Sequence, residues 1–336
     1  GREKETRRLV NRIKTGQSGV IIGIFGQERT ELLTSLRDKN LYGREVNHLI
    51  FSIIDIAGLE EDCTPEQFWR MALEVLREKI FQTNSKTLGK TFSDCQANNF
   101  SQSCLDKLFE EINKAGLRLV LLLDRFHEIL HKPDLNKITF LGKLRSLSTT
   151  SSSSCLVMTA HESLRKLHEE ITQEWGYSTS PFFNFMDVGE ITLGALSESD
   201  RDRVLKKLKL SKEAQAFIKN EVGRHPYLLG IATRRLIDAY EAQENNPVEV
   251  TKQDFYQHCE ALLYDDSMQP AWSSIMCQVF VQIAQGKFSS PDAHKAELKE
   301  LEKQGLIKPE NGQWQVLSPV FVKLLTEQDI STLCSK

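Results

Sequence analysis

The chain has 336 residues, of which 26% are charged and 40% are hydrophobic, and its formal net charge is −3. A chain of this length can form two or three domains with a large core. The nearly balanced charge gives no global attraction to nucleic acid or to an anionic membrane, so any such contact has to be local.

Seven cysteines are spread along the chain without a C-x-x-C pair. An odd number at such spacings is typical neither of a disulfide framework nor of a zinc site. No stretch approaches the roughly 18 consecutive apolar residues of a membrane span, and the charged N-terminus is unlike a signal peptide. We therefore expect a cytoplasmic protein without membrane contacts, and the abrupt ends suggest a module of a longer chain.

The first elements predicted are an amphipathic helix over 2–15 and then a strand, a turn and a helix over 18–33. The second stretch, SGVIIGIFGQERTELL, has the order of a P-loop, G-x-x-x-x-G-K-[ST]. In a P-loop, backbone N–H groups cradle phosphates, the lysine contacts the outer phosphates and the hydroxyl holds magnesium. Here Glu28 replaces the second glycine and Arg29 the lysine. A working nucleotide site, a decayed one and an unrelated turn all fit this pattern.

A second strand is predicted over 48–56, where a nearly continuous apolar run is typical of a parallel sheet buried on both faces. Thr64 and Pro65 then provide the N-cap and first turn of a helix. Residues 83–103 are polar, and we predict a loop there. Within it, Gly89-Lys90-Thr91 spells the end of a P-loop, but no strand precedes it, so we do not expect it to bind phosphate.

The run LRLVLLL at 117–123 ends in Asp124, which is the form of a Walker B segment, whose aspartate holds magnesium through water. Two more strands are predicted at 155–159 and 188–193. Five strands interleaved with helices predict a three-layer α/β domain with a mostly parallel sheet.

From Ser197 to Tyr264 the pattern is helical and indicates a small lid domain. It contains GRHPYLL at 223–229, in which Arg224 and His225 could face a nucleotide. A histidine beside a proline at a helix start is more often a cap or packing residue, and on these residues alone we favour that interpretation.

Residues 270–326 predict a winged helix-turn-helix, with helices over 272–285 and 291–304 and a hairpin that turns at Asn311-Gly312. On its second helix, lysines that could meet DNA phosphates alternate with glutamates. The lysines are Lys295, Lys299 and Lys303. Balanced charge and the lack of an arginine to read a guanine favour a protein-packing role over DNA reading. The predicted domains are thus 1–195, 196–268 and 269–336.

The ordered set of motifs resembles the STAND and archaeal-type branch of the AAA+ P-loop ATPases, which is related to the Orc1/Cdc6 initiators. The motifs are Gly1-Arg2-Glu3, the P-loop-like turn, FW at 68–69, LLLD at 121–124, LGKLRSL at 141–147, SPFFNF at 180–185, GRHPYLL at 223–229 and LSPVF at 317–321. The resemblance implies an ATP-switched oligomerisation module, commonly coupled to effector or sensor domains in bacterial signalling and defence.

The sequence departs from this family at the positions that carry chemistry. The family usually has Gly-Lys-Thr, Asp-Glu and a polar residue plus arginine where this chain has Glu28-Arg29-Thr30, Asp124-Arg125 and Ala160-His161. A carboxylate about 4 Å from a phosphate costs on the order of 4 kcal/mol at a protein surface. This is about a thousandfold in affinity.

Arg29 keeps a positive charge and could pair with Glu28, which would fill the cradle with a salt bridge. Arg125 cannot accept a proton, so the base that would orient the attacking water is missing, and Glu128 is the weak candidate to replace it. The degenerate nucleotide site thus comprises Gly23, Gly26, Glu28, Arg29, Thr30, Asp124, Arg125, His161 and His225. Thr30 and Asp124 are the magnesium ligands if magnesium binds.

The sequence therefore predicts a catalytically inactive AAA+/STAND-like pseudo-ATPase that acts as a protein-interaction module in a bacterial signalling or defence assembly. Its partner would be another protein or an adjacent domain of a longer chain. We expect no cofactor, with ATP or ADP and magnesium bound only if the site retains affinity. The alternatives are an ATP-binding oligomerising switch with residual activity and a DNA-associated initiator or transposition regulator.

Overall fold

The computed structural model describes residues 2–150, 153–175, 189–264, 274–326 and 333–334, and these form two compact units. The α/β unit contains Glu3–Ile22 and Gln27–Ile191. The C-terminal unit contains Thr192–Lys336 together with two short pieces, Gly1–Arg2 and Gly23–Gly26. The motif SPFFNF at 180–185 lies outside the described residues.

A five-stranded sheet in the order β2-β3-β4-β1-β5 forms the centre of the α/β unit. Its strands are β1 (Gly19–Ile22), β2 (Leu49–Asp55), β3 (Arg118–Asp124), β4 (Ser154–Ala160) and β5 (Glu190–Thr192). The pairs β1·β4, β2·β3 and β3·β4 are parallel, and Asp55 lies opposite Asp124. The carboxyl ends of these strands therefore meet at one edge of the sheet, which is where open α/β sheets place their sites. The predicted α/β fold is confirmed.

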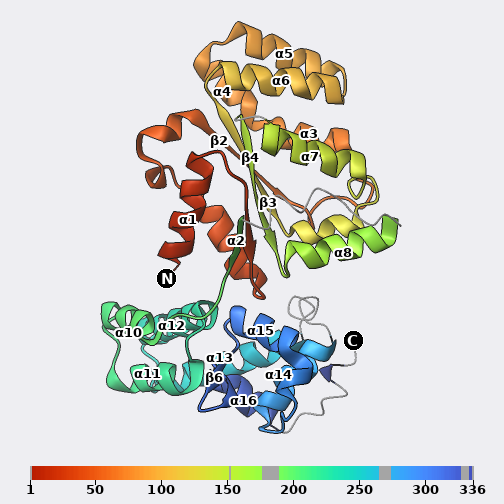
Figure 1. Cartoon of the computed structure of the whole chain (residues 1–336). Helices are drawn as coiled ribbons and strands as arrows, with labels where there is room; N and C mark the ends of the chain where they lie inside the picture. The colour runs from red at the N-terminus through yellow and green to blue at the C-terminus, as the bar shows by residue number, and fades with distance from the viewer. Residues whose placement is uncertain (1, 151–152, 176–188, 265–273, 327–332, 335–336) are drawn as a thin grey trace. The chain divides into compact units, whose positions relative to one another are not determined.

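Helices cover both faces of this sheet, with α1 and α2 on one side and α3 and α7 on the other (Figure 1). The helices are α1 (Glu3–Lys14), α2 (Gly26–Ser35), α3 (Pro65–Leu73), α4 (Val75–Thr83), α5 (Lys86–Ala97), α6 (Gln102–Lys114), α7 (Ile138–Thr150) and α8 (Leu164–Trp175). Short 3₁₀ turns occur at Lys39–Leu41, Gly43–His48 and Phe126–His131. The predicted cap of α3 is present as a capping box, in which Thr64 and Gln67 exchange hydrogen bonds.

The predicted loop at 83–103 is wrong, because most of it forms α5. Ser85 caps this helix by accepting a hydrogen bond from the N–H of Leu88, and Leu88, Phe92 and Cys95 form its buried face. Three apolar residues at helical spacing suffice to bury one face, although the segment is polar in composition. Gly89-Lys90-Thr91 therefore lies inside a helix, where the N–H of Gly89 bonds to the carbonyl of Ser85.

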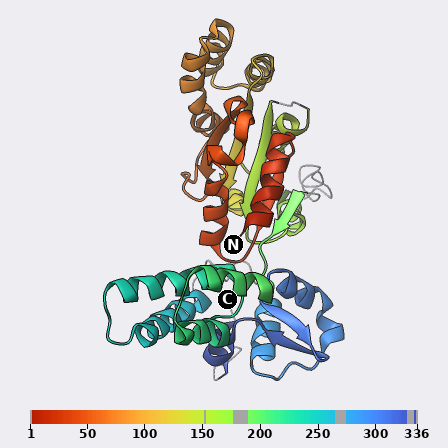
Figure 2. The same cartoon turned by 90° about the vertical axis from the view of Figure 1, so that its left-hand side faces the viewer.

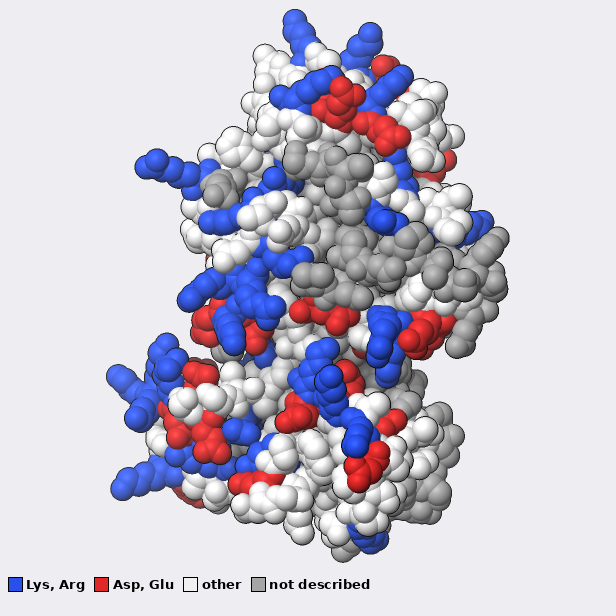
Figure 3. Space-filling model, viewed as in Figure 1, with Lys and Arg blue, Asp and Glu red and all other residues white. Residues whose placement is uncertain are grey.

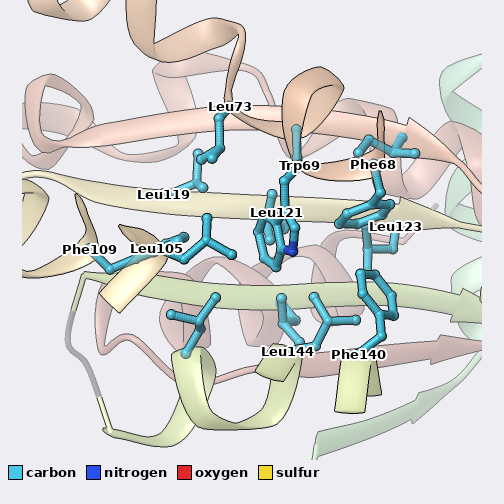
Figure 4. Packing of buried hydrophobic residues seen from close by; sticks show 14 of the residues in the cluster. Phe68, Trp69, Leu73, Leu105, Phe109, Leu119, Leu121, Leu123, Phe140 and Leu144 are labelled. Atoms are coloured by element: carbon cyan, nitrogen blue, oxygen red, sulfur yellow. The ribbon is translucent and has the colours of Figure 1, made fainter. Parts of the chain in front are cut away.

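The core of the α/β unit lies between the sheet and helices α3, α6 and α7 (Figure 4). Trp69 is 2% exposed and packs edge-on against Phe68 and Phe109. Leu119, Leu121 and Leu123, which alternate along β3, face the same cluster. This core fixes the position of β3 and hence of Asp124 at its end.

In its described residues the C-terminal unit consists mainly of helices, and a two-stranded hairpin packs beside helices of the same unit (Figure 2). Its elements are α10 (Glu198–Lys207), α11 (Lys212–Phe217), a π-turn (Ile218–Val222), α12 (Pro226–Glu241), α13 (Pro247–Tyr264), α14 (Ser274–Ala284), a 3₁₀ turn (Pro291–His294), α15 (Lys295–Lys303), β6 (Ile307–Glu310), β7 (Gln313–Val316) and α16 (Pro319–Leu325). Asn311 and Gly312 both have positive φ, as a two-residue hairpin turn requires. The wing-like hairpin is confirmed.

One hydrophobic cluster runs through this unit. It joins Phe217 of α11 and Phe255 of α13 to Phe280 of α14 and Phe321 of α16. The boundary at 268 lies outside the described residues, and the three-domain division stays a prediction.

One disulfide joins Cys277 of α14 to Cys334, with 57 residues of sequence separation. The odd count and wide spacing of the cysteines predicted no disulfide framework, and no local spacing rule pairs cysteines so far apart. The other five cysteines, which all lie in the described part of the chain, are free. No described helix has the length and apolar character needed to span a membrane.

Candidate functional site

The turn that corresponds to the P-loop is short. Strand β1 ends at Ile22 and α2 begins at Gly26, so only Gly23, Ile24 and Phe25 separate them. Glu28 lies in the first turn of α2, where a carboxylate is stabilised by the N–H groups and the positive end of the helix dipole. The chain is thus helical at positions that belong to the phosphate-wrapping loop in the P-loop motif.

Glu28 and Arg29 are both buried, with 7% and 3% of their surface exposed. Burial lowers the pKa of the Arg29 guanidinium to about 10, and the charges of Asp124 and Glu28 oppose this fall. Arg29 therefore stays protonated at neutral pH. A buried cation is tolerated only where opposite charges compensate for lost hydration, and these two carboxylates do so.

Asp124, at the end of β3, is 4% exposed, and both of its carboxylate oxygens accept hydrogen bonds. The Thr30 hydroxyl donates to Oδ2 at 2.6 Å, and the Thr159 hydroxyl donates to Oδ1 at 2.5 Å. The backbone N–H of Arg125 also donates to Oδ1, at 3.1 Å. The structure thus brings together Thr30 and Asp124, the two predicted magnesium ligands, and adds Thr159 of β4, which the sequence did not single out.

The side chain of Arg125 pairs with Asp55 at the end of β2. Its Nε donates to Oδ1 at 2.7 Å, and its Nη2 donates to Oδ2. This pairing raises the pKa of the Arg125 guanidinium. Arg125 has φ 50°, an unusual left-handed conformation for a residue with a side chain. Asp55 was missed in the sequence, although it also ends a buried strand and could have been noticed on that ground.

Two buried histidines lie beyond the strand ends. His161 directly follows β4, and its ring meets the ring of His127 edge-on at 4.1 Å. Burial lowers the pKa of His127 to about 2, and His161, Arg29 and Arg125 add to this effect. His127 is therefore neutral, so its 3.4 Å approach to Glu128 is not an ion pair at neutral pH.

Glu162 is a further buried group that sequence reasoning missed. It is 7% exposed and follows His161. Burial, together with the charge of Glu170, raises the pKa of Glu162, and Lys166 partly opposes the rise. Nothing in the local sequence distinguishes this glutamate from its exposed neighbours, since only the packing decides which of them is buried.

His225 belongs to the C-terminal unit, where it immediately precedes α12. It is 1% exposed, and burial lowers its pKa well below the ordinary value, with a further contribution from Arg2. Its ring lies 4.5 Å from that of Phe25, which itself stacks on Tyr227 at 4.4 Å. His225 is thus a packed residue at a helix start, and its aromatic neighbour comes from the P-loop turn.

The three lysines of α15 are exposed. Lys295 pairs with Asp292 at 2.9 Å. Figure 3 shows basic and acidic side chains interspersed over this helix. A mixed surface of this kind gives little net attraction to a polyanion.

Among solved structures, the chain is similar to the Walker-type ATPase PABY2304 of Pyrococcus abyssi, with 15% identity and a TM-score of 0.62 over 97% of this chain and 95% of that one. It also aligns with Cdc6p from Pyrobaculum aerophilum at 13% identity over 99% of this chain and 94% of that one, but the TM-score of 0.42 is too low to support an argument. No family model and no curated protein matches the sequence. The first similarity establishes a P-loop ATPase-like fold.

Proposed function

We propose that this chain is a P-loop ATPase-fold module that does not turn over ATP and acts by binding another protein or an adjacent domain. One observation carries the proposal: the acid that would orient the attacking water is replaced by Arg125, whose guanidinium is paired with Asp55. Both oxygens of Asp124 accept hydrogen bonds from threonine hydroxyls, and Arg125 stands where the family has an acid. The resemblance to STAND proteins supports a bacterial signalling or defence assembly as the setting.

The residues of the turn do not suit a triphosphate. The loop between β1 and α2 is three residues long. The buried Glu28 follows it in the first turn of α2, at a position where a P-loop would receive phosphate oxygens. Its charge would repel the polyanion, and burial weakens the solvent screening that relieves such repulsion. The hydroxyl of Thr30 and the carboxylate of Asp124 are suitable magnesium ligands by their chemistry, but they serve a nucleotide only if its phosphates can approach.

Two of the described residues that follow Asp124, Arg125 and His127, are unsuited to act as a general base. Arg125 pairs with Asp55, and His127 has a pKa of about 2, so it is a very weak base. Glu128 lies on the 3₁₀ turn after Asp124 and approaches His127. This arrangement supports a structural role for the strand-end cluster.

Calorimetric titration of the full chain with ATP and with ADP, each with magnesium, tests the proposal. We expect no binding in the micromolar range and no phosphate release. Tight binding, or turnover that disappears in Asp124→Ala, would overturn it in favour of a switch ATPase.

A repaired variant provides the matched control. Glu28→Gly with Arg29→Lys restores the P-loop wording, so it should bind Mg-ATP more tightly than the natural chain, by up to about a thousandfold if the Glu28 charge dominates. Glu31→Gly with Arg37→Lys, on the same helix and just after it, changes the same residue types outside the motif and should have no effect.

The DNA-associated alternative predicts salt-sensitive duplex binding that weakens when Lys295, Lys299 and Lys303 are replaced by glutamine. We expect no such binding, because acidic residues accompany these lysines on α15. Binding with a steep salt dependence that the triple variant reduces would favour the DNA role.

A further inference from the structure

The turn Gly23–Gly26 is part of the C-terminal unit, although the chain on both sides of it belongs to the α/β unit. Ile24 and Phe25 are 1% and 3% exposed and belong to the hydrophobic core of the C-terminal unit. A Cβ atom on Gly23 would lie 3.1 Å from the Cβ of Leu193, in the same unit. Ile24 and Phe25, which stand where a P-loop would hold phosphate, are therefore packed in the core of the C-terminal unit and not in the core that holds β1.

Phe25 is held in an aromatic slot formed by the start of α12. Its ring stacks on Tyr227 at 4.4 Å with an interplanar angle of 19°, and it meets His225 edge-on at 4.5 Å. Both are favoured aromatic geometries, and the rings of Phe25 and His225 are buried, while Tyr227 is partly buried. Moving Phe25 out of this slot would expose its ring to water and leave a cavity in the core.

Close backbone packing fixes the walls of this slot. The N–H of Leu196 donates to the carbonyl of Arg224 at 3.0 Å, which ties the chain after β5 to the start of α12. Gly305 has φ +73°, and a Cβ atom there would lie 2.0 Å from the backbone nitrogen of Ala195. The backbone at Ala195–Leu196 thus contacts both the start of α12 and the turn after α15 without intervening side chains. A change in the slot would therefore have to move these backbone segments as well.

We infer that Phe25 is a latch: its seat between His225 and Tyr227 holds the P-loop turn in the short, closed form, so that the C-terminal unit controls the shape of the phosphate cradle. This rests on the proposed function in that the closed turn does not wrap phosphate. The coupling is conformational and needs no bound nucleotide. A partner that rearranged the C-terminal unit would release the turn, and a change in the turn would disturb the core around α12.

Hydrogen exchange of the full chain tests the latch through the amides of Thr30 and Glu31, whose helical partners are the carbonyls of Gly26 and Gln27. Phe25→Leu keeps apolar volume but removes the ring contacts. We expect exchange at these two amides to become at least about tenfold faster in this variant, and Tyr227→Leu to act in the same direction.

Phe217→Leu is the matched control, because Phe217 is buried in the same core and packs against Phe255. It should not change exchange at Thr30 and Glu31. Equal acceleration in both phenylalanine variants would show a general loss of core stability, and no acceleration in either would show that Phe25 does not hold the turn; either result overturns the inference.

A second measurement uses the repaired chain with Glu28→Gly and Arg29→Lys. Adding Phe25→Leu should raise its affinity for Mg-ATP by about tenfold, whereas adding Phe217→Leu should not. A fall in affinity with Phe25→Leu would contradict the latch. Failure of the proposed function can be told from failure of the latch. The former appears as micromolar nucleotide binding by the natural chain, independently of the hydrogen-exchange rate at Thr30.

Discussion

The strand-end cluster around Asp124 and the winged-helix segment around α14 to α16 are held together in different ways. In the first, buried charges and hydroxyls satisfy one another, as in the bonds of Asp124 to Thr30 and Thr159. In the second, an apolar core and the disulfide Cys277–Cys334 dominate. Polar side chains thus satisfy one another in the first region, whereas apolar packing and a covalent bond hold the second.

Of the changes that test this comparison, removal of the Cys277–Cys334 disulfide should lower the free energy of unfolding most. In the chain-entropy description, a cross-link over about 57 residues stabilises the folded state by about 4 kcal/mol. Cys277→Ser, or reduction of the natural chain, should lower the stability of the C-terminal unit by this order, measured by urea unfolding followed with hydrogen exchange of each unit. The variant should be insensitive to reductant. If reduction does not change the natural chain, the disulfide does not contribute.

The strand-end cluster should respond next most strongly. Asp124→Ala removes a buried carboxylate that accepts three hydrogen bonds and whose charge acts on buried Arg29, so we expect a loss of about 3 kcal/mol in urea unfolding. Asp134→Ala, which breaks an exposed pair with Lys137, is the control and should cost less than about 0.5 kcal/mol. A loss at Asp124 as small as that at Asp134 would mean that the cluster is not structural.

His127, which lies near the strand-end cluster, should make the free energy of unfolding depend on pH, with a smaller effect than the loss of Asp124. The pKa of His127 is about 2 in the folded chain and near 6.5 when unfolded, so the unfolded state binds more protons below pH 6.5 and stability is lost as pH falls. Between about pH 7 and about pH 5 the loss is about 2 kcal/mol.

His127→Gln should remove this part of the pH dependence of stability. Glu162 acts in the opposite sense: its raised pKa makes stability increase as pH falls toward 4.5, so only the difference between variants isolates His127. An identical slope in His127→Gln and the natural chain would contradict the burial of a neutral imidazole.

Several features followed from local sequence alone. The apolar run before Asp124 predicted a buried strand, Thr64 and Pro65 predicted the start of α3, and Asn311-Gly312 predicted the hairpin turn. These depend on periodicity, capping and turn conformation, which involve residues close in sequence. Helix α5 forms where the polar composition predicted a loop, because the spacing of Leu88, Phe92 and Cys95 creates a buried face.

The partners of the charged residues could not be predicted in the same way. Arg125 was recognised as a replacement for an acid, but its ion pair with Asp55 joins residues that are 70 positions apart. The register of β2 against β3 places Asp55 opposite Asp124, and no local pattern encodes that register. The slot for Phe25 at His225 and Tyr227 likewise needs two distant segments to meet.

The sequence by itself determined the layout of this protein: an α/β sheet with a glycine-containing turn after β1 and an aspartate at the end of β3, followed by helices and a wing-like hairpin. These properties reside in short-range patterns and in side-chain chemistry. The tertiary structure decided the hydrogen-bond partners of these polar residues, such as Asp55 for Arg125. It also decided that the turn Gly23–Gly26 packs in the core of the C-terminal unit. A buried polar group has to find its hydrogen bonds within the fold because water does not reach it, as Asp124 does with Thr30 and Thr159.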